Sequence, residues 1–343
     1  MNTSIKLSIC IATFNRQHFI AETLDTIVKQ MRHDVELIVV DGASTDNTSY
    51  IMEHYSDKYK NVFYYKEEEN SGIDRDYDKA VGYARGEYCW LMTDDDLLCE
   101  GAISRVLENL DGLVNLVVVN AKVMNASLKS RLDSNILKID EDKNYTASQN
   151  SEMFIDLANY LSFIGCVVIK RSVWSARNRE AYYGSLFIHV GVIFQTPPVV
   201  NVKAIAEPVI IIRWGNAMWS ARAFEIWMFK WPKLIWSFDS FTKQSRSIVS
   251  RLEPWKSPTH LAFQRAVGGY SIAEYNRHIK SYPRKLSRVI PYLIALFPSS
   301  LMNVVATLYA LLAIKKARSR IYDLAYCKCS SRTSRVAARV LEV

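Results

Sequence analysis

Three apolar segments in the first hundred residues each end in a polar cluster, and this arrangement constrains the fold most. The segments 7–12, 35–40 and 87–92 are short and strongly apolar, which predicts buried strands. The stretches between them carry apolar residues at helical spacing. Strands that alternate with helices predict an α/β fold with a mostly parallel, Rossmann-like sheet and helices on its faces.

The same patterns give expected boundaries for the remaining elements. Helices are expected at 15–31 (capped by Asn15), 52–55, 74–85 and 102–110, and further strands at 62–65 and 113–119. Residues 121–150 lose the periodicity and gain Asn, Ser and Lys. We expect this stretch to form a loop or small excursion over the acceptor side of the active-site face.

Ligands of parallel α/β sheets bind beyond the carboxyl ends of the strands. Here those ends carry the polar residues 13–16, 41–46 and 93–96. No G-x-G-x-x-G follows the first strand, and neither a Walker lysine loop nor H-E-x-x-H is present, which argues against the usual dinucleotide, P-loop and zinc-protease sites. Acids at strand ends can hold a divalent metal that bridges to a diphosphate, or accept hydrogen bonds from a ribose and a base.

The three adjacent acids Asp94, Asp95 and Asp96 are the sharpest local feature. Adjacent carboxylates repel one another unless a cation offsets their charge. The alternative is a solvated acidic turn before the next helix. Asp41 is a second acid at a strand end, with an ordinary turn residue as its alternative, and together the acids favour a metal–diphosphate site.

Three motifs, in this order, carry a family resemblance: SICIATFNR (8–16), LIVVDGASTDNT (37–48) and the stretch 69–96 that ends in WLMTDDD. They resemble family-2 glycosyltransferases, inverting enzymes with the nucleotide-diphosphosugar transferase fold. The resemblance covers residues 5–215. VVIKRSVW (167–174) and EPVIIIRWGN (207–216) are similar to the abequosyltransferase-like branch, which implies transfer of a dideoxyhexose from a CDP-sugar to a lipid-linked oligosaccharide of O-antigen.

The resemblance implies a role for each strand-end residue. The expected nucleotide-binding residues are Thr13, Phe14, Arg16, Asp41, Asp74, Arg75, Asp94 and Asp95, with Asn70 and Gly72 near the base and ribose. The expected ligands of Mn²⁺ or Mg²⁺ are Asp95 and Asp96. Thr93 stands where the family pattern has its first aspartate, which makes the assignment ambiguous by one residue. The ribose would contact Asp94 or Asp95, and the metal would bind Asp95 or Asp96. Asp46 is a weaker candidate with a structural alternative.

An inverting transfer needs a base that removes the proton of the acceptor hydroxyl. In most of the family this base is a carboxylate, often in a Glu-Asp pair, and this chain has no such pair at the expected place. His189 stands there and is the expected catalytic base beside Asp96; Glu180, another group, or a merely packed histidine are the alternatives. Arg213 and Trp214 are expected to bind substrate, with an edge ion pair and core packing as their alternatives.

The C-terminal part is basic and aromatic. Residues 243–343 contain 18 Lys or Arg and four acids, a formal charge of +14, and residues 289–314 contain no charge. Arg284, Lys285 and Arg288 precede that run, and Lys315 and Lys316 follow it. Apolar sequence between basic clusters favours an anionic membrane surface over nucleic acid.

This uncharged run is expected to form a kinked, re-entrant or interfacial helix pair, because Pro298-Ser299-Ser300 interrupts it. A true span and a buried hairpin of a soluble domain are the alternatives. Six tryptophans between Trp214 and Trp255, Trp219 among them, add a second indication of headgroup contact. A packed aromatic helix explains them equally well.

The sequence therefore predicts a catalytic domain over residues 1–215 and a helical, membrane-associated region over 216–343. The expected activity is metal-dependent, inverting transfer of a sugar from a nucleotide diphosphate to a lipid-linked saccharide. The expected location is the cytoplasmic face of a bacterial inner membrane, with no nucleic-acid partner. The alternatives are a polyprenyl-phosphate or protein acceptor, or a degenerate, nucleotide-sugar-binding protein without turnover.

Overall fold

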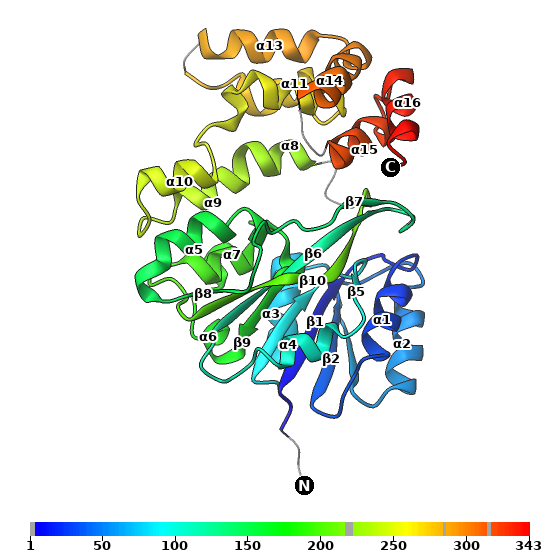
Figure 1. Cartoon of the computed structure of the whole chain (residues 1–343), viewed down its shortest axis with the longest axis vertical. Helices are drawn as coiled ribbons and strands as arrows, with labels where there is room; N and C mark the ends of the chain where they lie inside the picture. The colour runs from blue at the N-terminus through cyan, green and yellow to red at the C-terminus, as the bar shows by residue number, and fades with distance from the viewer. Residues whose placement is uncertain (1–3, 217–221, 284–285, 314–316) are drawn as a thin grey trace. The chain divides into compact units, whose positions relative to one another are not determined.

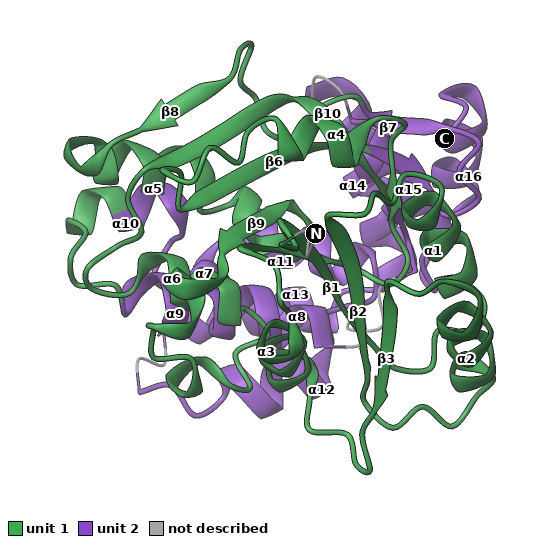
Figure 2. Ribbon diagram, turned by 90° about the horizontal axis from the view of Figure 1, so that it is seen from below, with its two compact units in different colours: residues 1–122, 134–212, 238–245 green, residues 123–133, 213–237, 246–343 purple. Residues whose placement is uncertain are grey.

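A computed structural model describes residues 4–216, 222–283, 286–313 and 317–343. The chain forms two compact units, which Figure 2 shows in different colours. Unit 1 consists of residues 1–122, 134–212 and 238–245, and unit 2 of residues 123–133, 213–237 and 246–343. Each unit is described by itself below.

Helices and strands alternate along unit 1, as the sequence predicts. Its strands are β1 (Leu7–Thr13), β2 (Val35–Asp41), β3 (Val62–Lys66), β4 (Tyr88–Met92), β5 (Leu97–Leu98), β6 (Leu116–Asn125), β8 (Lys143–Tyr145), β9 (Val167–Lys170) and β10 (Val202–Trp214). Its helices are α1 (Ile20–Val28), α2 (Thr48–Lys58), α3 (Ile73–Tyr83), α4 (Ala102–Leu107), α5 (Asn150–Leu157), α6 (Arg171–Ser175) and α7 (Ile188–Phe194). The ends of β6 and β10 continue into unit 2.

The sheet is mixed, and the prediction of a mostly parallel sheet is wrong in this respect. The strand order is β3-β2-β1-β4-β9-β6-β10-β5. Figure 1 shows the first two strands, β1 and β2, in blue. β1 pairs in parallel with β2 and β4, and β2 with β3. β9 runs antiparallel between β4 and β6, and β10 is antiparallel to β5 and β8. Local periodicity identifies a strand but carries no information on its direction or its neighbours, which long-range pairing decides.

The helices of the parallel half lie where right-handed crossovers put them. The chain steps from β1 to β2 and then to β3 in one direction, and it returns past β1 to β4. Right-handed connections of opposite direction lie on opposite faces of a sheet. Figure 2 shows α1 and α2 on one side of these strands and α3 on the other. The helices therefore lie on the faces of the sheet, and the carboxyl ends of the parallel strands form the edge at which ligands of such sheets bind.

Three local expectations need correction. α1 begins at Ile20 and not at 15, because Asn15 has φ 54° and its Oδ1 accepts a hydrogen bond from the backbone N–H of Thr45 at 2.8 Å, so it does not cap the helix. α2 covers Thr48–Lys58, more than the short stretch at 52–55. The region 121–150 contains the end of β6 and the short strands β7 and β8, which pair with β6 and β10.

Unit 2 is helical, with one short strand. It contains β7 (Arg131–Asp133), α8 (Ala223–Glu225), α9 (Trp231–Trp236), α11 (Pro258–Ala266), α12 (Ile272–Glu274), α13 (Val289–Leu296), α14 (Ser299–Ala313), α15 (Arg318–Tyr326), α16 (Arg332–Val340) and most of α10 (Lys243–Val249).

Aromatic side chains form much of the core of unit 2. Phe224, Trp255 and Tyr270 are buried in one cluster, in which the Phe224 and Tyr270 rings stack at 4.7 Å between centroids. Trp231 is buried as well. Trp231 and Trp255 therefore fit the packing alternative, whereas Trp214, Trp227 and Trp236 are half-buried, and Trp219 lies outside the described residues.

The uncharged run folds as two helices, α13 and α14, with the break at the interrupting proline. Within the described residues, no single helix combines the length and apolarity of a membrane span. By length and composition alone, the pair Leu286–Leu296 and Ser299–Ala313 could do so together, but its two helices are bent by 100°. The flanking basic residues Arg284, Lys285, Lys315 and Lys316 lie outside the described residues.

Candidate active site

The carboxyl ends of β1, β2 and β4 meet at one edge of the sheet in unit 1. The parallel register sets Thr13 beside Asp41 and Ile11 beside Met92. Phe14, partly buried, follows directly on β1. The polar residues that follow these three strands therefore share one edge, the position at which ligands bind in such sheets.

Arg16 joins the end of β1 to the acids after β4. Its Nε donates to Asp94 Oδ1 at 3.0 Å, and its Nη2 donates to Asp95 Oδ2 at 2.8 Å. The left-handed backbone at Asn15 turns the chain directly after β1, and the backbone N–H of Arg16 donates to Thr48 Oγ1 at 2.8 Å. The turn therefore holds the guanidinium over both carboxylates, where its side chain is only 11% exposed.

The three acids of this turn lie in a poorly solvated place. Asp94, Asp95 and Asp96 are all buried, with exposures of 8%, 8% and 3%. Burial raises the pKa of Asp94 to about 7; the charge of Arg16 opposes this rise, and that of Asp95 adds to it. A raised carboxyl pKa means that the site disfavours further negative charge and would gain from a cation.

The oxygen donors of this turn fit Mn²⁺ or Mg²⁺, since Mg²⁺ is commonly held by one or two carboxylates together with substrate phosphates. Asp96 accepts a hydrogen bond from Thr93 Oγ1 at 2.5 Å, so the threonine that replaces the first acid of the motif orients the third one. Across the part of the chain that the structure describes, no three or more His, Cys, Asp or Glu side chains are grouped as metal ligands. A cation held by one or two acids of this turn would take its remaining ligands from water or from the oxygens of a bound diphosphate.

Asp41 is fully buried and held by its own neighbours. Its Oδ2 accepts from the Tyr64 hydroxyl at 2.7 Å, and its Oδ1 accepts from the backbone N–H of Ser44 at 2.8 Å. Asp46 accepts from the backbone N–H groups of Gln17 at 3.1 Å and Thr48 at 2.9 Å. Although burial opposes it, these hydrogen bonds lower the pKa of Asp46. Its contacts are those of a turn-stabilising residue.

Helix α3 presents two acids and an arginine near this edge. The carboxylate of Asp74 accepts the backbone N–H groups of Leu186 at 2.9 Å and Ile188 at 3.1 Å, at the start of α7. Arg75 is exposed, and its guanidinium lies 5.0 Å from the centroid of the Tyr183 ring. The α3 helix begins after Gly72, whose N–H donates to Asn70 Oδ1 at 3.0 Å. Arg75 can thus turn towards an anion, whereas Asp74 is engaged by the backbone.

Asp76 belongs to this edge and was missed by sequence reasoning. It is buried, Ser71 Oγ donates to its Oδ1 at 2.9 Å, and its Oδ2 lies so close to Gly42 that a Cβ there would meet it at 2.8 Å. Burial raises the pKa of Asp76, and the nearby Asp41 adds to the rise. The available signal was its spacing of four residues from the apolar Ala80, which puts both residues on one face of α3.

His189 lies in α7, 1% exposed. Its Nε2 donates to the backbone carbonyl of Leu161 at 2.7 Å, and its Nδ1 is buried with no hydrogen-bond partner among the described residues. Burial lowers the pKa of His189 to about 4, although the bond to Leu161 opposes this. The ring is therefore neutral near pH 7, with a free lone pair on Nδ1. Glu180, the other candidate base, is exposed.

Arg213 and Trp214, at the end of β10, belong to unit 2. Arg213 is buried, and its Nη1 donates to the carbonyl of Ala126 at 3.0 Å. Trp214 Nε1 donates to Asp323 Oδ1 at 2.7 Å. Burial raises the pKa of Asp323 to about 6, against the hydrogen bond from Trp214. These contacts anchor both side chains within unit 2, and substrate binding by them stays a prediction.

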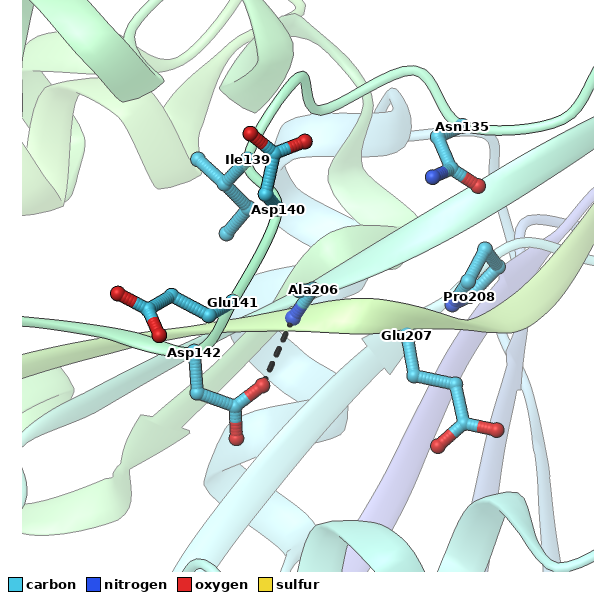
Figure 3. A pocket seen from close by; sticks show the side chains of 8 residues that line it. All are labelled: Asn135, Ile139, Asp140, Glu141, Asp142, Ala206, Glu207 and Pro208. Atoms are coloured by element: carbon cyan, nitrogen blue, oxygen red, sulfur yellow. Dashed lines mark hydrogen bonds between the residues drawn. The ribbon is translucent and has the colours of Figure 1, made fainter.

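A pocket of about 390 Å³ in unit 1 lies between residues 135–142 and β10. Figure 3 shows the acids Asp140, Glu141, Asp142 and Glu207 around it, with Asp142 accepting the N–H of Ala206. An acid-lined pocket repels a diphosphate. None of the strand-end acids lines it. This pocket is therefore not the expected nucleotide site.

Comparison with known proteins agrees with the motifs. Residues 8–161 match the sequence profile of glycosyl transferase family 2. An abequosyltransferase, RfbV, of Salmonella typhimurium is 27% identical over 224 residues, which cover 61% of this chain and 67% of that protein. A GalNAc(5)-diNAcBac-PP-undecaprenol beta-1,3-glucosyltransferase of Campylobacter jejuni is 29% identical over 104 residues, 30% of this chain and 34% of that protein. The chain thus spans about two thirds of the first relative and a third of the second.

The fold has a counterpart among solved structures. S. aureus TarS 1–349, crystallised in complex with UDP, superimposes with a TM-score of 0.56 at 17% sequence identity, covering 94% of this chain and 91% of that one. At this identity the likeness concerns the fold alone.

Proposed function

We propose that this chain, which carries a family 2 glycosyl transferase domain over residues 8–161, transfers a sugar from a nucleotide diphosphate, with inversion, to a hydroxyl of a lipid-linked saccharide. The single observation that carries the proposal is the buried turn Asp94–Asp95–Asp96, tied by Arg16 to the end of β1. A glycosyltransferase needs to hold a dianionic leaving group at such a place, and excess carboxylate charge calls for a bridging cation.

In the proposed donor site, Asp95 and Asp96 hold the divalent cation, which when bound neutralises charge on the leaving diphosphate. Thr13, Phe14, Asp41 and Asp76 line the nucleotide side. Arg16 holds the carboxylates of Asp94 and Asp95 in place, and Arg75 is the cation that can turn towards a phosphate. Asp94, with its raised pKa, is the acid whose charge depends most on what is bound.

His189 is the proposed base. Its Nε2–H donates a hydrogen bond to the carbonyl of Leu161, so Nδ1 is the atom that would take the proton of the acceptor hydroxyl. A base with a pKa of about 4 is a weak one. Displacement of the diphosphate develops its leaving-group charge as the hydroxyl attacks, so a weak base suffices if the leaving group is well stabilised.

The finer identity of the substrates rests on the relatives. The resemblance to an abequosyltransferase favours a CDP-dideoxyhexose donor and an O-antigen acceptor, and the undecaprenol-linked substrate named for the Campylobacter relative favours a lipid-linked acceptor. The proposed place of action is the cytoplasmic face of a bacterial inner membrane. A polyprenyl-phosphate or protein acceptor keeps the same donor site, and a degenerate binding protein would retain the nucleotide without turnover.

Calorimetric titration of CDP, UDP, GDP and TDP, with and without Mn²⁺ or Mg²⁺, tests the donor site. We expect one diphosphate to bind in a metal-dependent manner and Asp96→Asn to abolish that binding. Glu141→Gln, which removes an exposed acid of the other pocket, is the matched control and should bind normally. If no diphosphate binds to the folded protein, the proposal fails. If a diphosphate binds but the protein consumes the corresponding sugar nucleotide with no lipid-linked acceptor, the chain is a nucleotide-sugar-binding protein without turnover.

A further inference from the structure

The exposed apolar side chains of the described chain are concentrated on two helices of unit 2. Thirteen of the 23 exposed large hydrophobic residues fall between Leu286 and Leu312. Soluble proteins rarely expose contiguous apolar surface of this extent, and where they do, it marks an interaction site. We propose that this outer surface of α13 and α14 inserts shallowly into the anionic surface of a lipid bilayer without crossing it.

The polarity of α14 is inverted with respect to a helix of a soluble protein. Its buried residues include Asn303 and Thr307, both fully buried. Asn303 Nδ2 donates to the carbonyl of Leu324 at 2.9 Å, and its Oδ1 accepts the N–H of Ser331 at 3.0 Å. These bonds turn the polar side of α14 towards the protein. Its large apolar side chains point outward: Leu301, Val305, Leu308, Tyr309, Leu311 and Leu312.

α13 also directs most of its large apolar side chains outward. It buries Pro291 and Ala295, and Ile294 is half-buried against the core of unit 2, whereas most of its large side chains are exposed. Among them are Tyr292 at 42% and Leu293 at 58% exposure. In a hairpin buried inside a soluble domain these leucines would be covered, and the exposure of Leu293 and Leu296 argues against that alternative. Exposed tyrosines suit a headgroup region, because the ring is apolar and the hydroxyl needs a wet partner.

The positive charge around these helices favours an anionic lipid surface as the partner. Residues 275–322 contain nine Lys or Arg and no Asp or Glu. Of these, Arg277, Lys280 and Arg320 are described as exposed. Basic residues beside an apolar surface are attracted to anionic lipid by about 1 kcal/mol each. A second copy of this chain would bring the same basic charges together, which disfavours a homodimer through this surface.

The dimensions favour shallow insertion over a span. α14 has 15 residues and is about 22 Å long at 1.5 Å per residue, whereas the hydrocarbon core is about 30 Å thick. α13 has eight residues and leaves α14 at 100°. Two short helices at that angle can lie in the interface with one face in lipid, as interfacial helices do.

Flotation of the full chain with vesicles tests this surface, and it uses neither donor nor acceptor, so its failure is distinguishable from failure of the proposed function. We expect binding to phosphatidylethanolamine–phosphatidylglycerol vesicles and a several-fold weaker binding to phosphatidylcholine alone or in 1 M salt. Leu293→Asp/Leu308→Asp should weaken partitioning more than tenfold. The matched control is Tyr50→Asp/Leu113→Asp, which charges two exposed apolar side chains of unit 1 and should bind as the wild type does.

Three results would overturn the inference. The first is unchanged flotation of the α13–α14 variant, with circular dichroism showing both variants folded. The second is loss of a dimer in that variant, by light scattering, while vesicle binding stays unchanged, which would make a second copy the occupant. The third is resistance of the membrane-bound chain to alkaline carbonate extraction, which would indicate a span.

Discussion

Replacing Arg16 by methionine removes the one described cation that pairs with Asp94 and Asp95, with little change in side-chain volume. Both ion pairs are short, at 3.0 and 2.8 Å, and all three side chains are about 90% buried. Breaking a buried ion pair leaves an uncompensated charge and costs about 3–5 kcal/mol. We therefore expect Arg16→Met to fold but to be markedly less stable.

The loss of folding stability caused by Arg16→Met should be larger at higher pH. The folded pKa of Asp94 is raised from 3.8 to about 7. The folded state thus binds the proton more tightly than the unfolded chain, and stability falls as pH rises between the two values. From pH 6 to pH 8 the wild type loses about 1.4 kcal/mol at this residue. Without Arg16 the pKa of Asp94 rises further, so the loss of stability from pH 6 to pH 8 grows towards its limit of about 2.7 kcal/mol.

The measurement is urea unfolding of wild type and Arg16→Met at pH 6 and pH 8, in the presence of a chelator. The destabilisation should be larger at pH 8 by about 1.4 kcal/mol. Arg32→Met is the matched control, because Arg32 pairs with Asp34 at 3.1 Å on the surface, where such a pair contributes about 0–1 kcal/mol. Equal destabilisation by Arg16→Met at both pH values, or a cost no larger than that of the control, would refute the assigned pairing.

Four further predictions follow from the described contacts. Asp96→Asn should lower transfer by at least about 10²-fold without changing the circular dichroism spectrum, because it removes a proposed cation ligand; near-normal turnover in a transfer assay would remove Asp96 from the site. His189→Gln should lower kcat by about 10²-fold with little change in KM, and since the His189 pKa is about 4, the pH–rate profile should show no histidine limb near pH 6.5. Asn303→Leu should destabilise the chain by about 1–3 kcal/mol in urea unfolding, because it removes the buried hydrogen bonds that the Asn303 amide makes with the Leu324 carbonyl and the Ser331 N–H. Asp323→Asn should raise stability at pH 8 by about 1–2 kcal/mol and change it little at pH 4, because burial raises the folded pKa to about 6 and stability then falls as pH rises through that window.

The sequence predicts the parallel half of the fold well, because each of its strands is a local apolar run followed by a helix. The antiparallel half is not predictable in this way. β9 is a four-residue strand whose place between β4 and β6 depends on pairing with residues about 50 to 80 positions away. The short strands β7 and β8 likewise exist through pairing with β6 and β10 and not through periodicity.

The candidate site was predictable where a side chain follows a strand directly, and not where contacts across the fold decide. Arg16, Asp41 and the three acids of the β4 turn are examples of the first kind. The pairing of Arg16 with both Asp94 and Asp95 was not predictable, because it depends on the turn at Asn15. Asp76 was missed because an acid on a helix is commonly solvated, and only the packing of α3 against β1 and β2 buries it.

Asp74 shows how the two sides of the proposed reaction are connected. The resemblance assigns it to the nucleotide, yet its carboxylate accepts the N–H groups of Leu186 and Ile188 at the start of α7, where a negative charge stabilises the helix end. His189 follows directly. The same helix, α3, carries Arg75 and Asp76 towards the donor side. The position of the proposed base therefore depends on the helix that also faces the donor, and a loss of turnover on substitution of Asp74 would report the placement of α7 as much as any nucleotide contact.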